Sequence, residues 1–269
     1  MRFQEHFETA SCMVDKNDNI RPSDLVRFMQ ETADHQMRDE KPSYADLFRQ
    51  GQAFIVTRMV IQIHAQLHEY DKVDGYTWSA GHKGATFYRN YLLKRGDELA
   101  AEAYSEWTVV DHRTGKLCRV SDVDISNFSK DEMIEPRLPK RFRYPKGQEF
   151  EQLDTHIVRY SECDMNRHMN NAVYFNLLWD YIPGVSEKEV TSMNIRFMHE
   201  AAEGSSMEIY RTQLDPAVAG DAAAEEVYGF RTSVDGKTNV ECVFGVRRTE
   251  NQGFMDAFLA ESQNGGTEN

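Results

Sequence analysis

Residues 159–183, Arg159-Tyr-Ser-Glu-Cys-Asp-Met-Asn-Arg-His-Met-Asn-Asn-Ala-Val-Tyr-Phe-Asn-Leu-Leu-Trp-Asp-Tyr-Ile-Pro183, change from a polar, extended pattern to a helical one. Apolar residues recur at helical spacing and stop before Pro183, which predicts a helix over about 169–182. The apolar stripe consists of Val173, Tyr174, Leu177, Leu178 and Tyr181. Because such a stripe must be buried, the strand-like runs that follow predict a curved antiparallel sheet packed against this helix.

A polar turn immediately precedes the predicted helix. Asp164, Asn166 and His168 alternate along it, and Asn170 and Asn171 follow at the helix start. Backbone N–H groups in a first helical turn lack partners, and the helix dipole is positive there. A carboxylate, an amide and an imidazole gathered at this place could stabilise an oxyanion. The alternative is a polar N-cap with a surface histidine.

The composition indicates a globular protein without a membrane span. The chain has 269 residues, 40% of them apolar and 11% aromatic, which allows one large domain or two medium ones. No apolar run approaches the roughly 20 residues of a membrane-spanning helix, and the charged N-terminus does not resemble a signal peptide. The four cysteines are far apart, which favours reduced thiols and a cytoplasmic protein, and we expect no metal and no cofactor.

The formal net charge of −13 argues against nucleic acid as a partner. One basic cluster departs from this balance and comprises Arg137, Lys140, Arg141, Arg143 and Lys146. On an acidic protein such a cluster is either a docking site for an acidic partner or part of a solvated linker. Hydrophobic periodicity is lost over residues 121–148, which hold three prolines, so we expect an extended linker there.

The chain contains the same order of elements before and after this linker. Before it, we expect a strand at 3–14, helices at 23–38 and within 42–51, and strands at 53–67, 72–80, 86–95, 99–110 and 116–121. After it, we expect a strand at 149–160, the helix at 169–182, and strands at 189–199, 206–214, 224–234 and 238–248. Asp235-Gly236 is a hairpin signal between the last two strands, and one amphipathic turn is expected in the final residues.

An internal repeat supports this division. Asp15-Lys-Asn17-Asp-Asn19 aligns without gaps on Asp164-Met-Asn166-Arg-His168, at an offset of 164 − 15 = 149 residues. The first copy has Asn19 where the second has His168. This indicates a duplication in which only the second half keeps an active site, although the match is short enough for coincidence to be the alternative.

The motif resembles that of a known family. Asp164-Met-Asn-Arg-His-Met-Asn-Asn-Ala-Val-Tyr174 is similar to the D-x-N-x-H-V-N-N-x-x-Y signature of acyl-acyl-carrier-protein thioesterases, itself a variant of the D-x-x-G-H-V-N-N motif of hotdog-fold thioesterases. Other segments with family resemblance are Ile20–Ala33 (first helix), Phe54–Arg58, Tyr76–Trp78 and Arg89 (first-domain strands), and Asn194–Glu200 (the segment with the catalytic glutamate). The resemblance covers about residues 3–248.

The resemblance implies an α+β fold of two tandem hotdog domains, each a long central helix wrapped by a curved antiparallel sheet. The expected division is an N-terminal hotdog at 1–121 with the acyl-chain pocket and a degenerate site, a linker at 122–148, a catalytic hotdog at 149–250 and a tail at 251–269. It also implies release of free fatty acid from acyl carrier protein. Plant members carry a transit peptide that this chain lacks, so a bacterial cytoplasmic enzyme is expected. Ala201 replaces the cysteine that follows the glutamate in plant members, so no thiol nucleophile is expected there.

Thioester hydrolysis needs an activated water and a polarised carbonyl. We expect Glu200 to be the base, because apolar neighbours in a strand would desolvate it, with Asp164 as the alternative or as a second participant. Asn166 and His168 would hydrogen-bond the water or the tetrahedral intermediate, and N–H groups near Met169–Asn171 would polarise the carbonyl. Cysteine 163 could instead be read as a nucleophile, but its side chain should point away from that of the neighbouring Asp164 in an extended segment.

Further residues are assigned from their position and from the resemblance. The expected substrate-binding residues are Asn170, Asn171 and Tyr174, with Phe28, Met29 and Thr32 in the acyl tunnel. Lys140, Arg141 and Arg143 are the expected docking residues for acyl carrier protein. The alternatives are an acyl-coenzyme A thioesterase and a non-catalytic hotdog protein that binds acyl thioesters. A homodimer formed through sheet edges also stays open.

Overall fold

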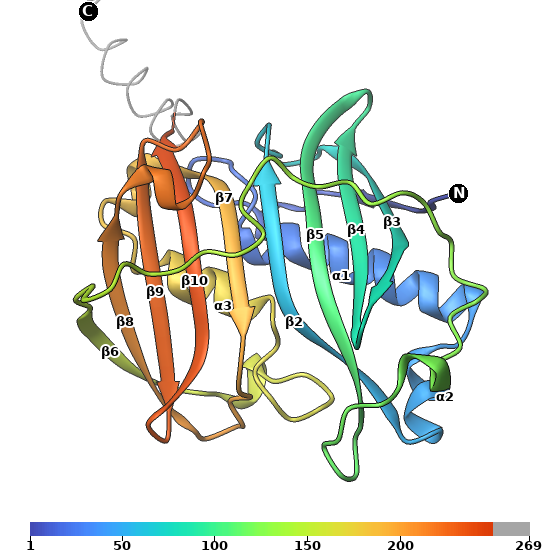
Figure 1. Cartoon of the computed structure of the whole chain (residues 1–269). Coiled ribbons are helices and arrows are strands. Elements are labelled where there is room, and N and C mark those ends of the chain that lie inside the picture. The colour runs from blue at the N-terminus through green and yellow to red at the C-terminus, as the bar shows by residue number, and fades with distance from the viewer. Residues whose placement is uncertain (250–269) are drawn as a thin grey trace, which may run out of the picture.

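Ten strands form one antiparallel sheet in the computed structural model, which describes residues 1–249. The strand order is β1-β3-β4-β5-β2-β7-β10-β9-β8-β6. The strands are β1 (Phe3–Glu8), β2 (Gln52–Ile63), β3 (Lys72–Lys83), β4 (Thr86–Arg95), β5 (Glu98–Asp111), β6 (Glu151–Ile157), β7 (Lys188–Phe197), β8 (Ser206–Leu214), β9 (Glu226–Val234) and β10 (Lys237–Arg248). The sheet has the same connectivity on either side of the central β2–β7 pair, where Met59 lies opposite Ile195 (Figure 1).

In the described residues, the helices α1 (Pro22–Glu40) and α3 (Val173–Trp179) lie on one face of this sheet, and the short helix α2 (Tyr44–Arg49) lies by one end of β2 (Figure 1). Pro22 opens α1 at a position where its missing N–H costs nothing. Alternating residues of β2 separate the two faces, because Met59 and Ile61 pack with the helices whereas Val60 packs on the other side. One continuous apolar core therefore runs beneath α1 and α3 and joins both halves of the sheet.

The second helix of the expected pair is short. We expected a helix over 169–182 and a long central helix in each half, but α3 has only seven residues. The start is delayed because the Met169 N–H donates to the Ala201 carbonyl over 2.9 Å and the Asn170 N–H donates to the Glu162 carbonyl over 2.8 Å. These bonds hold residues 168–170 extended against a neighbouring segment. The expectation of a long helix is correct for α1 and wrong for α3.

Two of the strands expected from the sequence differ from those in the structure. β1 ends at Glu8, and a 3-10 turn at Ser11–Met13 occupies the rest of the expected strand 3–14. No strand forms over 116–121 of the described chain, where a single bridge joins Leu117 to Val110 before a 3-10 turn at Val120–Asp122. The Asp235-Gly236 hairpin turn has both residues at positive φ, 52° and 71°, as a tight hairpin turn requires. The expected tail at 251–269, with its amphipathic turn, lies outside the described residues.

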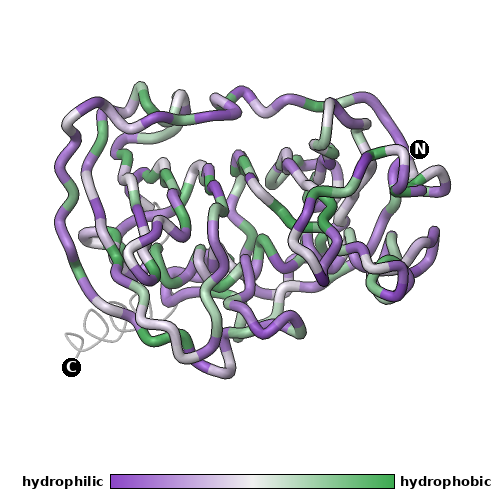
Figure 2. The backbone as a smooth tube through the Cα atoms, turned by 60° about the horizontal axis from the view of Figure 1, so that its bottom comes forward, coloured by the Kyte–Doolittle hydropathy of each residue, from purple (hydrophilic) through white to green (hydrophobic). Residues whose placement is uncertain are grey.

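The segment 123–150 has no helix or strand and packs along the sheet face opposite the helices. Leu138 packs on Val60 and Tyr104, while Phe142 and Tyr144 join a cluster on β8, β9 and β10. Figure 2 shows this segment running the length of the molecule along one side. The segment is extended, as expected, and it is packed on the sheet, with Arg137, Arg141, Arg143 and Lys146 exposed. None of the helices in the described part meets the length and apolarity of a membrane span.

Candidate active site

The motif turn brings Asp164, Asn166 and His168 together by backbone geometry. The Asp164 carboxylate accepts the Asn166 N–H over 2.8 Å, and the Asp164 N–H donates to the His168 carbonyl over 3.0 Å. Arg167 takes the left-handed conformation, with φ of 65°, which closes the turn. An aspartate that bonds the backbone two residues later is a recurring turn device. Asp164 therefore shapes the turn on which Asn166 and His168 are presented.

The second component of the site comes from the segment after β7. Glu200 Oε2 lies 3.3 Å from His168 Nε2, and the two side chains are 60% and 34% exposed. The bridge between His168 and Ala202 and the bond from the Met169 N–H to the Ala201 carbonyl hold the two segments together. We expected Glu200 to be a desolvated strand residue, and this is wrong, because β7 ends at Phe197 and the carboxylate faces solvent.

A buried polar network supports the Glu200 segment. The Met198 and His199 N–H groups both donate to the Asn239 carbonyl, over 2.9 and 3.2 Å, and the Asn239 amide donates to the His199 carbonyl. Tyr174 hydrogen-bonds Asn239, and burial raises the pKa of Tyr174 to about 12. Only 2% of Tyr174 is exposed, so it lies beneath the site, with its ring edge against Phe197.

The asparagines that follow the turn are largely engaged with the backbone. The Asn170 side-chain oxygen accepts the Ala172 N–H over 2.8 Å, an Asx-turn contact just before α3. The Met169 and Asn170 N–H groups donate to backbone carbonyls. We expected N–H groups near Met169–Asn171 to polarise a substrate carbonyl, but those of Met169 and Asn170 are engaged in these backbone bonds. Asn171 is half-buried beside them.

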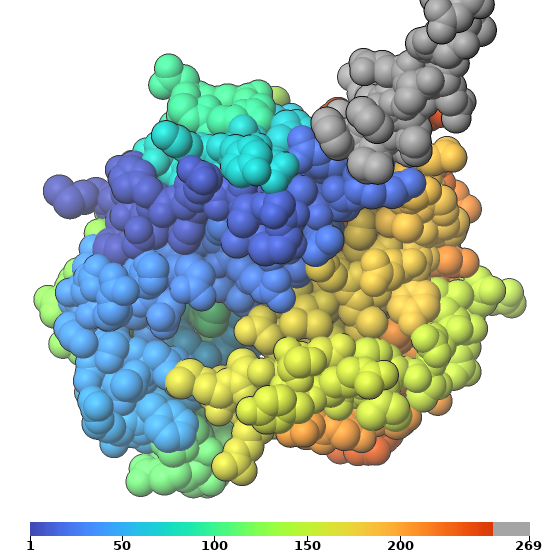
Figure 3. Space-filling model, turned by 180° about the vertical axis from the view of Figure 1, so that it is seen from behind, coloured from blue at the N-terminus to red at the C-terminus, as the bar shows by residue number. Residues whose placement is uncertain are grey.

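Sequence reasoning missed Tyr44, which comes from the first half of the chain. The Tyr44 hydroxyl donates to the Asn166 side-chain oxygen over 2.7 Å. The sequence predicted a short helix at 42–51, and α2 confirms it, but no local pattern could pair residues that are 122 positions apart. Figure 3 shows a hollow in the surface between the blue region of α1–α2 and the yellow turn of the second half.

The three residues assigned to the acyl tunnel lie on the buried face of α1. Phe28, Met29 and Thr32 are 4%, 0% and 0% exposed. The Phe28 ring stacks on Phe7 of the edge strand, with centroids 4.7 Å apart. A Cβ at Gly75 of β3 would lie 2.6 Å from the Thr32 hydroxyl, so glycine permits α1 to approach the sheet there. These positions shape the interior of the first half.

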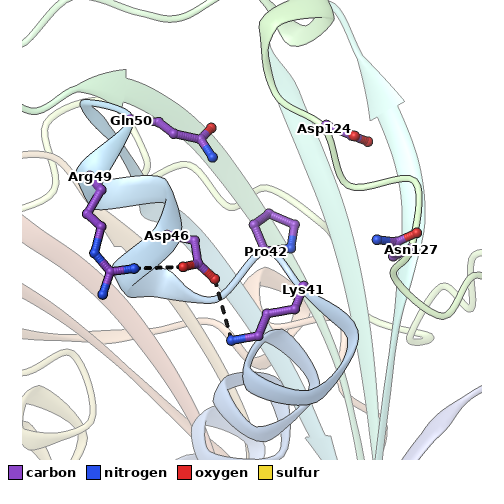
Figure 4. A pocket seen from close by; sticks show the side chains of 7 residues that line it. All are labelled: Lys41, Pro42, Asp46, Arg49, Gln50, Asp124 and Asn127. Carbon is purple, nitrogen blue, oxygen red and sulfur yellow. Dashed lines mark hydrogen bonds and ion pairs between the residues drawn. The ribbon is translucent and has the colours of Figure 1, made fainter.

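Two other charged features lie away from the motif turn. Lys140 is bound to Glu135 at 2.5 Å, while Arg141 and Arg143 are exposed on the sheet face opposite the helices. A cavity of about 500 Å³ beside α2 is lined by Lys41, Pro42, Asp46, Arg49, Gln50, Asp124 and Asn127 (Figure 4). All of its lining residues except Pro42 are polar or charged, and Asp46 pairs with both Lys41 and Arg49, so it does not have the character of an acyl pocket.

The first half contains a second copy of the motif turn. The Asp15 carboxylate accepts the Asn17 and Asn19 N–H groups over 2.8 and 3.0 Å, and the Asp15 N–H donates to the Asn19 carbonyl over 2.8 Å. Asp18 has φ of 59°, at the position that corresponds to Arg167 by the offset of 149 residues. Asn17 and Asn19 are only 4% and 3% exposed, so this copy is closed to solvent.

Solved structures of thioesterases share this fold. An acyl-ACP thioesterase from Bacteroides thetaiotaomicron matches with a TM-score of 0.77 and 18% identity, over 91% of this chain and 98% of that one. The 12:0-ACP thioesterase from Umbellularia californica matches with a TM-score of 0.71 and 14% identity, over 92% and 94%. With its antiparallel sheet and few helices, the chain has the hotdog-like fold of the thioesterase class.

Sequence comparison identifies the family within this class. The model of the acyl-ACP thioesterase N-terminal domain matches residues 1–127, and that of the C-terminal domain matches residues 146–250. The chain belongs to the acyl-ACP thioesterase family. Among curated relatives, the chloroplastic acyl-[acyl-carrier-protein] hydrolase FATB2 of Cuphea viscosissima is 21% identical over 238 residues, and oleoyl-acyl carrier protein thioesterase 2 of Arabidopsis thaliana is 24% identical over 225. The matches cover 81% and 79% of this chain, which spans only 56% and 58% of those relatives.

Proposed function

We propose that this protein hydrolyses the thioester of fatty acyl-acyl carrier protein, giving free fatty acid and holo-carrier protein and so ending chain elongation. The observation that carries the proposal is the meeting of His168 with Glu200 at 3.3 Å beside the Asp164 turn, in a chain of this family. The site lies at the hollow between the halves, where an acyl thioester could enter (Figure 3).

The reaction requires addition of water to the thioester carbonyl and cleavage of the carbon–sulfur bond. We assign activation of the water to Glu200, because its carboxylate is accessible and has His168 as its neighbour. His168 would orient this carboxylate and deliver a proton to the departing thiolate. The Asn166 amide N–H would stabilise the oxyanion of the tetrahedral intermediate. Asp164, which accepts a backbone N–H of the turn, would chiefly hold Asn166 in place.

We propose the division into two hotdog units, residues 1–121 and 149–250, joined by the linker 122–148. Support comes from the matching strand connectivity on either side of the β2–β7 pair and from the repeated motif turn. The interior beneath α1 would accept the acyl chain, with Phe28, Met29 and Thr32 along its wall. Asn171, half-buried at the site, would contact the substrate near the thioester.

For the carrier protein, we propose contact with the exposed guanidinium groups of Arg141 and Arg143. An acidic partner would find there a local cluster of cations on a chain whose net charge is −13. Lys140 contributes less, since Glu135 already neutralises it. If the protein forms a homodimer, the free edges of the sheet are β1 and β6, but both are short and carry charged residues, which disfavours edge pairing.

The test is a comparison of matched substrates with the purified protein. Release of free thiol would be followed with the same acyl chain on acyl carrier protein and on coenzyme A. The proposal predicts multiple turnovers and a kcat/KM at least tenfold higher for the carrier-linked substrate. A preference for the coenzyme A substrate would make the protein an acyl-coenzyme A thioesterase. Binding without thiol release in a single-turnover experiment would make it a non-catalytic acyl-thioester-binding protein.

A further inference from the structure

Tyr44 is presented to the motif turn by a short helix that is well fixed at both ends. At the start of α2, Ser43 Oγ accepts the Asp46 N–H over 3.2 Å, and Asp46 accepts the Ser43 N–H over 3.0 Å, which is a capping box. Near its end, the Phe48 ring stacks on His112, with centroids 3.9 Å apart and planes within 5°. The position of the Tyr44 hydroxyl is therefore determined by the first half of the chain.

The surroundings of Asn166 determine which way its amide faces. The side-chain oxygen accepts from the Tyr44 hydroxyl over 2.7 Å, and the side-chain nitrogen lies 3.5 Å from Asp164 Oδ2. A carboxylate can only accept hydrogen bonds, so the nitrogen must face Asp164 and the oxygen must face Tyr44. Burial raises the pKa of Tyr44, which keeps its hydroxyl protonated and able to donate. Among the described residues, the other amide N–H of Asn166 has no hydrogen-bond partner and is available to a ligand.

The closed copy of the turn in the first half has the opposite arrangement. There the Asn17 side-chain nitrogen donates to the Ser186 carbonyl over 2.9 Å, so the protein itself uses the amide donor. At Asn166 the contact from the other half is instead made to the amide oxygen, which accepts the hydrogen bond from the Tyr44 hydroxyl. In each copy the contact comes from the connection between helix and strand in the other half of the chain. A carbonyl at this contact occupies the amide N–H, as at Asn17, whereas a hydroxyl that donates to the amide oxygen leaves an N–H available for a ligand, as at Asn166.

We propose that Tyr44 is a positioning residue for thioester hydrolysis, whose hydroxyl holds the Asn166 amide with an N–H directed at the reacting carbonyl. This inference rests on the proposed function for its catalytic consequence. The first half of the chain then contributes to the chemical step through a defined hydrogen bond, and not only through the acyl pocket. Since the bond fixes a group that acts on the oxyanion, its loss affects kcat more than KM.

The experiment compares Tyr44→Phe with Tyr160→Phe, which removes a hydroxyl from a residue that is 82% exposed on the preceding turn. Tyr44→Phe keeps the ring beside Phe48 and should leave the melting temperature unchanged. We expect kcat on acyl-acyl carrier protein to fall about tenfold with KM within twofold, the scale of one lost hydrogen bond in a transition state. Tyr160→Phe should behave as wild type. In an Asn166→Ala background, Tyr44→Phe should cause no further loss.

Wild-type kcat in Tyr44→Phe, or an equal loss in the Asn166→Ala background, would overturn the positioning role. A second readout needs no catalysis: the side-chain ¹⁵NH₂ signals of Asn166 should shift in Tyr44→Phe and stay in place in Tyr160→Phe. Unchanged signals in Tyr44→Phe would also overturn the inference. If the wild-type protein releases no thiol from any acyl thioester, it is the proposed function that fails, and the amide signals still decide whether Tyr44 orients Asn166.

Discussion

Gln66 occupies in the first half of the chain the position that Glu200 occupies in the second. The same hydrogen bonds surround Gln66 and Glu200. The N–H groups of the two preceding residues both donate to one carbonyl of a neighbouring strand. The carbonyl of the following residue accepts an N–H from the residue that follows the motif turn. These bonds join His64 and Ala65 to Ala100 (2.8 and 3.2 Å) and Ile20 to Leu67 (2.8 Å) in the first half, and Met198 and His199 to Asn239 (2.9 and 3.2 Å) and Met169 to Ala201 (2.9 Å) in the second.

Two of the three ionisable members of the candidate site are thus replaced by amides in the first half, and Asp164 keeps its counterpart, Asp15. Asn19 stands where the second half has His168, and Gln66 stands where it has Glu200. An amide neither takes up nor releases a proton near neutral pH, so the first copy has no counterpart of the His168 imidazole or the Glu200 carboxylate for acid–base chemistry. The asymmetry between two similar turns therefore supports the proposal that proton transfer takes place in the second half.

The interior beneath α1 should control the length of the acyl chain. Met29→Ala removes a side chain that is fully buried there and should shift the released fatty acids toward longer chains. The fatty acids would be profiled by gas chromatography after hydrolysis of a mixture of acyl-acyl carrier proteins. The substitution should also cost about 2–5 kcal/mol of unfolding free energy, as for other buried truncations.

Met207→Ala is the matched control for this change, because Met207 is equally buried but lies on β8 in the second half. It should carry a similar stability cost without altering the chain-length profile. The same shift in both variants would show that general loosening of the core, and not space beneath α1, sets the product length.

Charge reversal in the linker should separate carrier recognition from catalysis. Arg141→Glu with Arg143→Glu should raise KM for acyl-acyl carrier protein several-fold and leave the matched coenzyme A substrate unaffected, with the difference shrinking at high salt. Lys83→Glu with Lys116→Glu makes the same change of charge at other exposed positions and serves as the control. An equal rise in KM for both substrates would show that Arg141 and Arg143 do not bind the carrier protein.

The packing of the linker on the sheet can be tested through one hydroxyl. The Tyr144 hydroxyl donates to the Phe230 carbonyl over 2.7 Å and lies 3.1 Å from the Cys242 carbonyl. Tyr144→Phe leaves both carbonyls without this donor and should lower the unfolding free energy by about 1–2 kcal/mol in urea. Tyr210→Phe, whose hydroxyl bonds only the side chain of Glu208, should cost much less. An equal loss of unfolding free energy in both variants would mean that packing of the linker on the sheet contributes little to stability.

Sequence periodicity predicted those features that depend on neighbouring residues. α1, α2 and nine of the eleven expected strands follow from local patterns and are present at nearly the expected places, including the β9–β10 turn at Asp235-Gly236. The strand expected at 116–121 is not formed, because a short apolar run does not specify which strand it would pair with. The helix start at 169 failed as well, because tertiary bonds to Glu162 and Ala201 override the local preference.

The candidate site was predictable only in part for the same reason. The spacing of Asp164, Asn166 and His168 is local, and the turn is formed as that spacing suggests. Glu200 could be assigned as a catalytic residue only by resemblance to the family. Its exposure was predicted wrongly, because nothing in the apolar sequence before it indicates that β7 ends at Phe197. Tyr44 and Gln66 carry no local signal, because their places in the two halves depend on contacts with residues that are distant in the sequence.

The central claim is that the second-half turn and Glu200 form one hydrolytic site. The most direct measurement is the single-turnover rate of acyl-acyl carrier protein hydrolysis by Glu200→Gln, which gives the second half the amide found at Gln66, alongside Asp164→Asn. We expect Glu200→Gln to lower the rate by about 10²–10⁴-fold, the contribution typical of a general base, and Asp164→Asn to lower it as well, with unfolding midpoints close to that of the wild type. Near-wild-type rates in both folded variants would contradict the account.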